Sequence, residues 1–140
     1  MSPARRAQLA RAKARLDTLE LYPRPVSLRG VRLVVAPWFF RVPGFRRYHG
    51  YALVRTILVR RAHSSDDLVT HELCHVWQMQ QRPLHVMWTW LVRSYRANPY
   101  EVEARRATAA TRATAATVTS QAAPAATSSH ESRPGTASVS

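Results

Sequence analysis

The chain has 140 residues, a formal net charge of +13 and a single cysteine. This length suits one domain with a modest hydrophobic core, and one cysteine excludes an internal disulfide. All but one of the basic residues are arginines, and they are dispersed without a zinc-finger spacing or an RNA-binding signature. A generally basic surface is therefore a simpler interpretation than nucleic-acid binding, which stays an alternative.

An Ala/Arg-rich amphipathic helix is predicted at residues 3–20, within an N-terminal basic segment at 1–22. Such a helix usually packs on the core, and a propeptide or a partner-binding arm are the alternatives. The segment is basic and has no continuous apolar run, so no secretory signal is expected. Pro23 and Pro25 then interrupt the chain.

Two segments rich in β-branched residues, 31–36 and 51–60, are predicted to be strands. The loop between them, at 37–50, is heavy in aromatic residues. Helices follow further along the chain, so the expected fold class is α+β, with a small sheet packed on a helix.

A helix is predicted at residues 66–81. Ser65 and the two aspartates after it offer an N-cap oxygen and first-turn negative charge, and Pro83 ends the run. The apolar positions of this helix fall opposite its two histidines, as a helix packed into a core requires. Gln78 returns to the histidine face, where it either orients a ligand or borders a pocket.

The pentapeptide HELCH at 71–75 is the most informative stretch of the sequence. In a helix His71 and His75 project from one face and can bind a single zinc ion, with Glu72 beside it as a proton acceptor. Random placement of the chain's histidines and glutamates would produce HExxH in roughly 1 % of such sequences. Cys74, inside the motif, is expected to pack in the core.

Further helices are predicted at 84–97 and 99–112, and the aromatic residues of the first are expected to be core residues. The longest apolar stretch, Leu84 to Val92, is too short to cross a bilayer, and we expect a cytoplasmic protein. The Ala/Thr/Ser-rich segment 113–140 is expected to be a disordered tail, although its alanines could extend the preceding helix.

A catalytic zinc normally has three protein ligands, so one more is needed. The metzincin arrangement is excluded because Gln78 and Gln81 stand at its Gly and His positions. His85 has an unfamiliar spacing from the motif, and His130 lies in the predicted tail. A carboxylate of the segment 98–104, where Asn and Pro favour a helix start, is the better candidate.

HELCH together with the EVEA segment at 101–104 resembles the gluzincin clan of zinc metallopeptidases. In that clan a second helix supplies the third ligand from a Glu-x-x-(Ser/Ala)-Asp motif, and alignment on Ala104 implies this role for Glu101. Arg105 stands where the clan usually has an Asp that supports a ligand histidine. The chain is also similar to small uncharacterised bacterial proteins with a minimal zincin-like domain, and the resemblance covers about residues 50–108.

The resemblance implies a zincin-like domain at residues 23–112 that binds one Zn²⁺ through His71, His75 and Glu101. In such folds a sheet edge near the active helix holds the extended peptide substrate by strand addition. Glu103 would face solvent or pair with an arginine, because it points away from Glu101 in a helix.

The implied activity is hydrolysis of peptide bonds, with Glu72 as the general base. Three residues before or beside Glu101 are candidates to stabilise the transition state: Tyr95, Arg96 and Tyr100. The alternatives are a zinc-binding module without catalysis and a basic nucleic-acid-binding protein.

Overall fold

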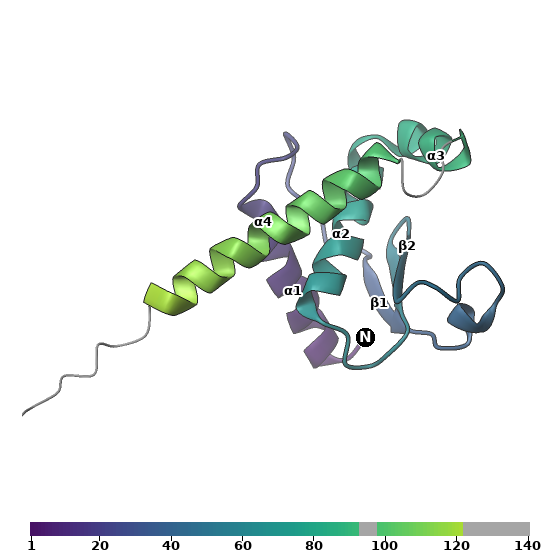
Figure 1. Ribbon diagram of the computed structural model, residues 1–140, viewed down its shortest axis with the longest axis horizontal. Coiled ribbons are helices and arrows are strands. Elements are labelled where there is room, and N and C mark those ends of the chain that lie inside the picture. Colours follow the sequence, from purple (N-terminus) through teal and green to yellow (C-terminus); the bar gives the residue numbers. More distant parts are fainter. Residues whose placement is uncertain (93–97, 122–140) are drawn as a thin grey trace, which may run out of the picture.

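The computed structural model describes residues 1–92 and 98–121, with side chains up to residue 114. Its elements in chain order are α1 (Pro3–Asp17), β1 (Arg32–Val35), the short 3-10 helix η1 (Phe39–Arg41), β2 (Gly50–Leu53), β3 (Thr56–Val59), α2 (Asp66–Gln81), α3 (Pro83–Val92) and α4 (Pro99–Gln121). The predicted α+β class is confirmed (Figure 1).

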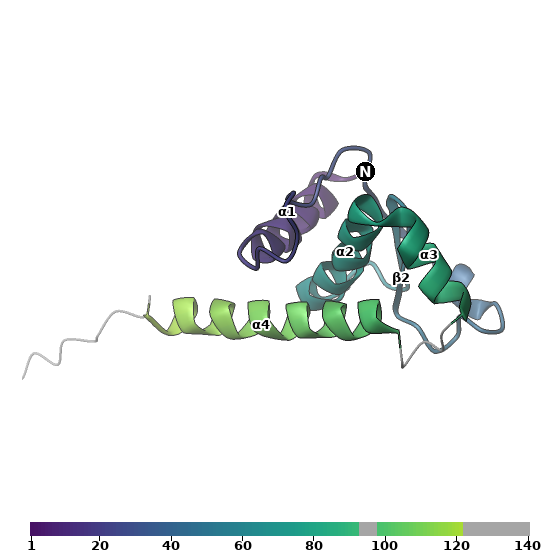
Figure 2. The same ribbon diagram turned by 90° about the horizontal axis from the view of Figure 1, so that it is seen from above.

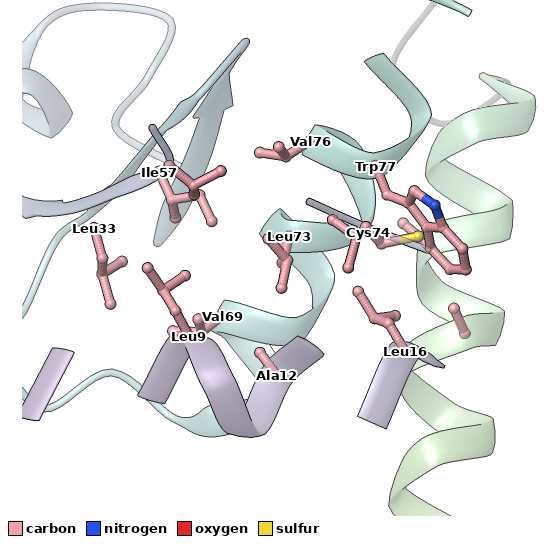
Figure 3. Close-up of a cluster of buried hydrophobic side chains, with 14 of the residues drawn as sticks. Leu9, Ala12, Leu16, Leu33, Ile57, Val69, Leu73, Cys74, Val76 and Trp77 are labelled. Carbon is pink, nitrogen blue, oxygen red and sulfur yellow. The ribbon is translucent and has the colours of Figure 1, made fainter. Parts of the chain in front are cut away.

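Helix α2 occupies the centre of the fold. In Figure 3 the sheet lies on one side of α2 and α4 on the other, with α1 at the bottom of the view, and Figure 2 shows α1 and α4 on different sides of α2. The apolar side of α2, including Val69, Leu73 and Trp77, is fully buried against residues of α1 and the sheet such as Leu9 and Ile57. The prediction that the histidines lie opposite a core-facing side is therefore confirmed.

The starts of α2 and α4 follow the predicted signals. The Ser65 hydroxyl accepts a hydrogen bond from the Leu68 N–H at 3.2 Å, which satisfies one free donor at the start of α2. At the start of α4 the Asn98 side chain accepts one from the Tyr100 N–H at 3.0 Å. Helix α4 continues to Gln121 and past the body of the fold in both views, beyond the predicted end at 112.

The sheet has the strand order β1-β3-β2, with β1 parallel and β2 antiparallel to β3. The prediction of one strand at 51–60 was wrong, because this segment folds into a hairpin that turns at Val54 and Arg55. Val54 adopts a positive φ of 42° without the Gly, Asn or Asp that usually marks such a turn. Strand β3, which precedes α2, is therefore central, and β1 and β2 are the edge strands.

The aromatic loop between β1 and β2 covers the outer face of the sheet. Phe39 contacts Phe40, Phe45 and Tyr51 in edge-on or tilted geometry, with ring centroids 4.5 to 5.7 Å apart. This second, smaller cluster keeps the sheet apolar on both faces and holds β2 in place.

Helix α3 differs from its prediction. Its aromatic residues were expected in the core, yet Trp88 is 62 % exposed. The aliphatic Leu91 on the same helix is 79 % exposed. Trp90 is half-buried and packs edge-on against His75, with ring centroids 5.7 Å apart. Among residues 1–92 and 98–121, none of the helices combines the length and apolarity that a bilayer span requires.

Two aspartates at the start of α2 fasten the neighbouring helices to it. Asp67 pairs with Arg15 of α1 and Arg112 of α4, each at 2.6 Å, and Asp66 pairs with Arg11 at 2.8 Å. Hydrogen bonding from Arg15 lowers the pKa of the Asp67 carboxyl below its ordinary value. The first turn of α2 thus combines a favourable position for negative charge with links between three helices.

We expect Asp67→Asn to lower the free energy of unfolding by about 1 kcal/mol at neutral pH. Because the pKa of Asp67 is lowered in the folded state, its stabilisation is complete above the unfolded pKa of about 3.9 and disappears as the pH falls through the folded value. Denaturant unfolding of both proteins across this range measures the effect. Asp17→Asn, which breaks only an exposed pair with Lys13, is the control and should cost less.

Candidate metal centre

Three side chains from two helices converge beside the sheet. His71 and His75 project from α2, and their Nε2 atoms lie 3.2 Å apart. From α4, the Glu101 carboxylate lies 3.3 Å from His75 Nε2 through Oε2 and 3.6 Å from His71 Nε2 through Oε1. One possible ligand atom from each residue lies within 4.8 Å of the others. The two histidines and the carboxylate that the sequence predicts are thus brought together.

The spacing of these atoms suits a tetrahedral zinc ion. Two ligand atoms about 2.0 to 2.1 Å from one such ion are about 3.3 Å apart, close to the separations seen here. Glu101 is 1 % exposed, and its Oε2 atom has no hydrogen-bond partner within the described part of the chain. A buried carboxylate oxygen is costly without a partner, so this set of donors fits a bound cation.

The charges of Glu101 and His75 depend on each other. Burial raises the pKa of the Glu101 carboxyl, but the proximity of the His71 and His75 imidazoles outweighs it and lowers that pKa below the ordinary value. Burial lowers the pKa of His75, while the two nearby carboxylates raise it to a net value above the ordinary one. The ligand carboxylate is therefore held in the charged form that metal binding needs.

Arg105 also contacts the candidate ligand. Its Nε donates to Glu101 Oε1 at 2.9 Å, one helical turn along α4. Arg105 stands at the position where the gluzincin motif has an acidic residue. In this structure its guanidinium neutralises and orients the Glu101 carboxylate from the solvent side. Oε2 remains directed at the histidines, so the contact leaves one oxygen for a cation.

Glu72 lies on the same side of α2 and is 6 % exposed. Burial raises the pKa of its carboxyl above the ordinary value, against the opposing effect of the two histidines. A Cβ atom at Gly50 would lie 2.6 Å from Glu72 Oε1, so β2 can approach this carboxylate only because residue 50 is glycine. Glu72 is thereby confined between the edge strand and the histidine pair.

A buried chain of hydrogen bonds supports His75 from behind. Its Nδ1 lies 2.8 Å from Gln78 Oε1, while Gln78 Nε2 donates to the Tyr100 carbonyl at 2.9 Å and to Glu103 Oε1 at 3.1 Å. The Tyr22 hydroxyl donates to the same oxygen of Glu103. An acceptor on Nδ1 leaves Nε2 as the metal-binding nitrogen of a neutral imidazole.

The prediction that Glu103 faces solvent or pairs with an arginine was wrong. It is partly buried and accepts hydrogen bonds from Gln78 and Tyr22. Glu101 and Glu103 do point in different directions, as helix geometry requires, but both directions lead into packed structure because α4 contacts both α2 and the segment after α1. Gln78 is buried, does not line the cleft and is hydrogen-bonded to the His75 ring.

A cleft of about 340 Å³ opens onto the candidate centre. The Gly50–Leu53 strand forms one wall, α3 forms the other, and the HELCH face of α2 forms the floor. The lining side chains are mostly apolar and include Tyr48, Tyr51, Ala52, Leu53, Met79, Val86, Met87, Trp90 and Leu91. An apolar cleft with a few convergent polar groups at its base is the usual form of a ligand site.

The other residues predicted for the site have different outcomes. Tyr95 and Arg96 lie outside the described residues. Tyr100 is buried and does not line the cleft, and its hydroxyl lies 2.5 Å from His85 Nδ1. Cys74 is fully buried, and burial raises the pKa of its thiol to about 12, which confirms the core role.

Sequence reasoning missed Gly50, Tyr22 and the wall of the cleft formed by α3. A signal existed for Gly50, since a glycine inside a strand often marks a close approach. No local signal links Tyr22 to a residue 81 positions away.

Comparisons with known proteins add no relationship: no protein-family model, curated protein or solved structure matches the chain.

Proposed function

We propose that this protein is a zinc-dependent metallopeptidase. The observation that carries the proposal is the convergence of His71, His75 and the partnerless Oε2 of Glu101, with Glu72 buried beside them at the base of a cleft. Two imidazoles and one carboxylate with an open side are the ligand set of a catalytic zinc, whereas a structural zinc is closed by four protein ligands.

When bound, zinc supplies a coordinated water of lowered pKa and polarises the substrate carbonyl. Glu72 accepts a proton from that water and passes it to the leaving amine. Its raised pKa suits this role, because a general base works best when its pKa approaches the working pH. Gln78 keeps the His75 ring in one orientation and tautomer throughout.

The free edge of the sheet at β2 supports the proposal that the substrate is a polypeptide. Arg60 N–H donates to the His49 carbonyl at 2.9 Å, and pairing alternates along the hairpin from there. The N–H and C=O groups of Gly50 and Ala52 therefore point to the free edge of β2, which borders the cleft. An extended peptide could pair with them as an added strand and so lie across the candidate centre.

A zinc-binding module without catalysis is the second candidate. The contact between Arg105 and Glu101 favours it, because the guanidinium draws negative charge away from the ligand carboxylate. Zinc content would be the same in both cases. Hydrolysis of a peptide library, measured with zinc-loaded protein, distinguishes them.

Metal analysis tests whether the candidate centre binds zinc, on which the proposed activity depends. Purified protein dialysed against zinc should hold one ion per chain, and His71→Ala or His75→Ala should abolish tight binding because each removes a ligand. His49→Ala and His63→Ala are matched controls, since both residues line a separate depression away from the HELCH face. Folded wild-type protein that stays free of zinc under these conditions would refute the proposal.

A further inference from the structure

The outer face of α3 carries an uninterrupted apolar stripe. Its five exposed members recur at the helical spacing i, i+3, i+4, i+7 and i+8: Leu84, Met87, Trp88, Leu91 and Val92. Leu84 is 82 % exposed and Leu91 is 79 % exposed, although the opposite side of α3 already packs on α2. The helix has no charged residue, so it is apolar on both sides, which is typical of a helix with a second apolar partner.

The tip of the β2–β3 hairpin extends this surface. Leu53 is 44 % exposed and Val54 is 62 % exposed, and Leu53 lines the cleft together with Met87 and Leu91. Figures 1 and 2 show α3 and β2 at the end of the molecule opposite to the free end of α4. The stripe on α3 and this tip are called the apolar end below.

The segments that form the apolar end, and their neighbours in the chain, contain no acidic residue. Residues 21–65, which include the hairpin and the aromatic loop, contain nine arginines and no Asp or Glu, and residues 73–100 again contain no acidic residue. Most of the chain's few carboxylates are committed elsewhere, at the candidate centre or in ion pairs with α1 and α4. An apolar surface formed by segments that carry arginines or no charge, and no carboxylate, complements a negatively charged, partly apolar surface.

We propose that the apolar end docks the protein onto an anionic lipid bilayer, with α3 lying in the interface between headgroups and acyl chains. Trp88 is suited to that depth, because its amphipathic ring favours the interfacial region. The arginines of the hairpin and loop contact the anionic headgroups. This attachment is independent of the metal, and it would present the cleft mouth to segments of polypeptide close to the membrane.

Co-sedimentation with lipid vesicles tests the docking. The protein should bind vesicles of phosphatidylcholine mixed with phosphatidylserine, bind phosphatidylcholine alone much less, and dissociate as salt is raised. The double variant Leu84→Ser/Leu91→Ser should lower the partition coefficient at least about tenfold, because two large apolar side chains no longer leave water. Both residues are mostly exposed, so circular dichroism and melting temperature should stay unchanged.

The matched control is Leu21→Ser/Val34→Ser, which removes two exposed apolar side chains on other elements and should bind as wild type. Tryptophan emission locates the contact, because vesicles should shift it to shorter wavelength in wild type and Trp38→Phe but not in Trp88→Phe. His71→Ala should bind vesicles normally, which separates this proposal from the metal site.

Two outcomes would overturn the proposal. One is undiminished vesicle binding by Leu84→Ser/Leu91→Ser. The other is a wild-type protein that ignores both vesicle types but forms a dimer that the same double substitution disrupts, since the apolar end would then be a contact between two copies of the chain.

Discussion

Glu72→Gln should reduce peptide-bond hydrolysis at least ~10²-fold while leaving one zinc ion per chain. Glutamine has the shape of glutamate and fits the same space against Gly50, but it cannot accept and return a proton. Removal of a buried charge that burial already disfavours should not destabilise the fold. Steady-state kinetics on a peptide substrate and metal analysis of the same preparation measure the two effects together.

Glu20→Gln is the matched control for this variant. It makes the same chemical change at an exposed position after α1 and should leave both hydrolysis and zinc content unchanged. Loss of zinc from Glu72→Gln would identify Glu72 as a ligand, which the proposed mechanism does not allow. Equal hydrolysis by wild type and Glu72→Gln would exclude Glu72 as the base.

Glu101→Ala should weaken zinc affinity by at least ~10²-fold, because it removes one of three ligands and leaves the two imidazoles to hold the ion alone. The ion pair between Glu101 and Arg105 would be lost in the same variant. Competition with a chelator of known affinity measures the loss. Folding should be retained, since removal of Glu101 also removes a buried charge.

Glu103→Ala provides the comparison two residues away. It should weaken zinc affinity by about tenfold, because Gln78 loses one of the contacts that fix it against His75. It should also lower the free energy of unfolding by about 1 to 3 kcal/mol, because the half-buried Tyr22 hydroxyl loses its acceptor. A greater loss of zinc from Glu103→Ala than from Glu101→Ala would move the third ligand to Glu103 and remove the basis of the resemblance.

The sequence determined features that arise within one turn or one helix. The four-residue spacing of His71 and His75 places them on one face whatever surrounds the helix. Ser65 and Pro83 bound α2 through local hydrogen bonding and sterics. The α+β class followed in the same way, from the alternation of β-branched and helix-forming segments.

Tertiary packing decided the features that depend on residues distant in the chain. The hairpin at Val54 has no turn-forming residue, and its strained turn is held by pairing with β3 and by packing around the sheet. Glu103 is predicted to face solvent or pair with an arginine, because helix periodicity gives the direction of a side chain but not its surroundings. In the fold the Tyr22 hydroxyl lies in that direction and donates a hydrogen bond to Glu103.

The features of the candidate centre also divide into those that local sequence determines and those that tertiary packing decides. Its histidines and base lie on one helix and are readable from five consecutive residues. The meeting of Glu101 with them, the glycine that lets β2 approach Glu72 and the cleft wall formed by α3 all require that separate elements pack together. Local periodicity specifies the direction of a side chain, whereas its environment depends on the free energy of burying whole helix and strand faces against one another.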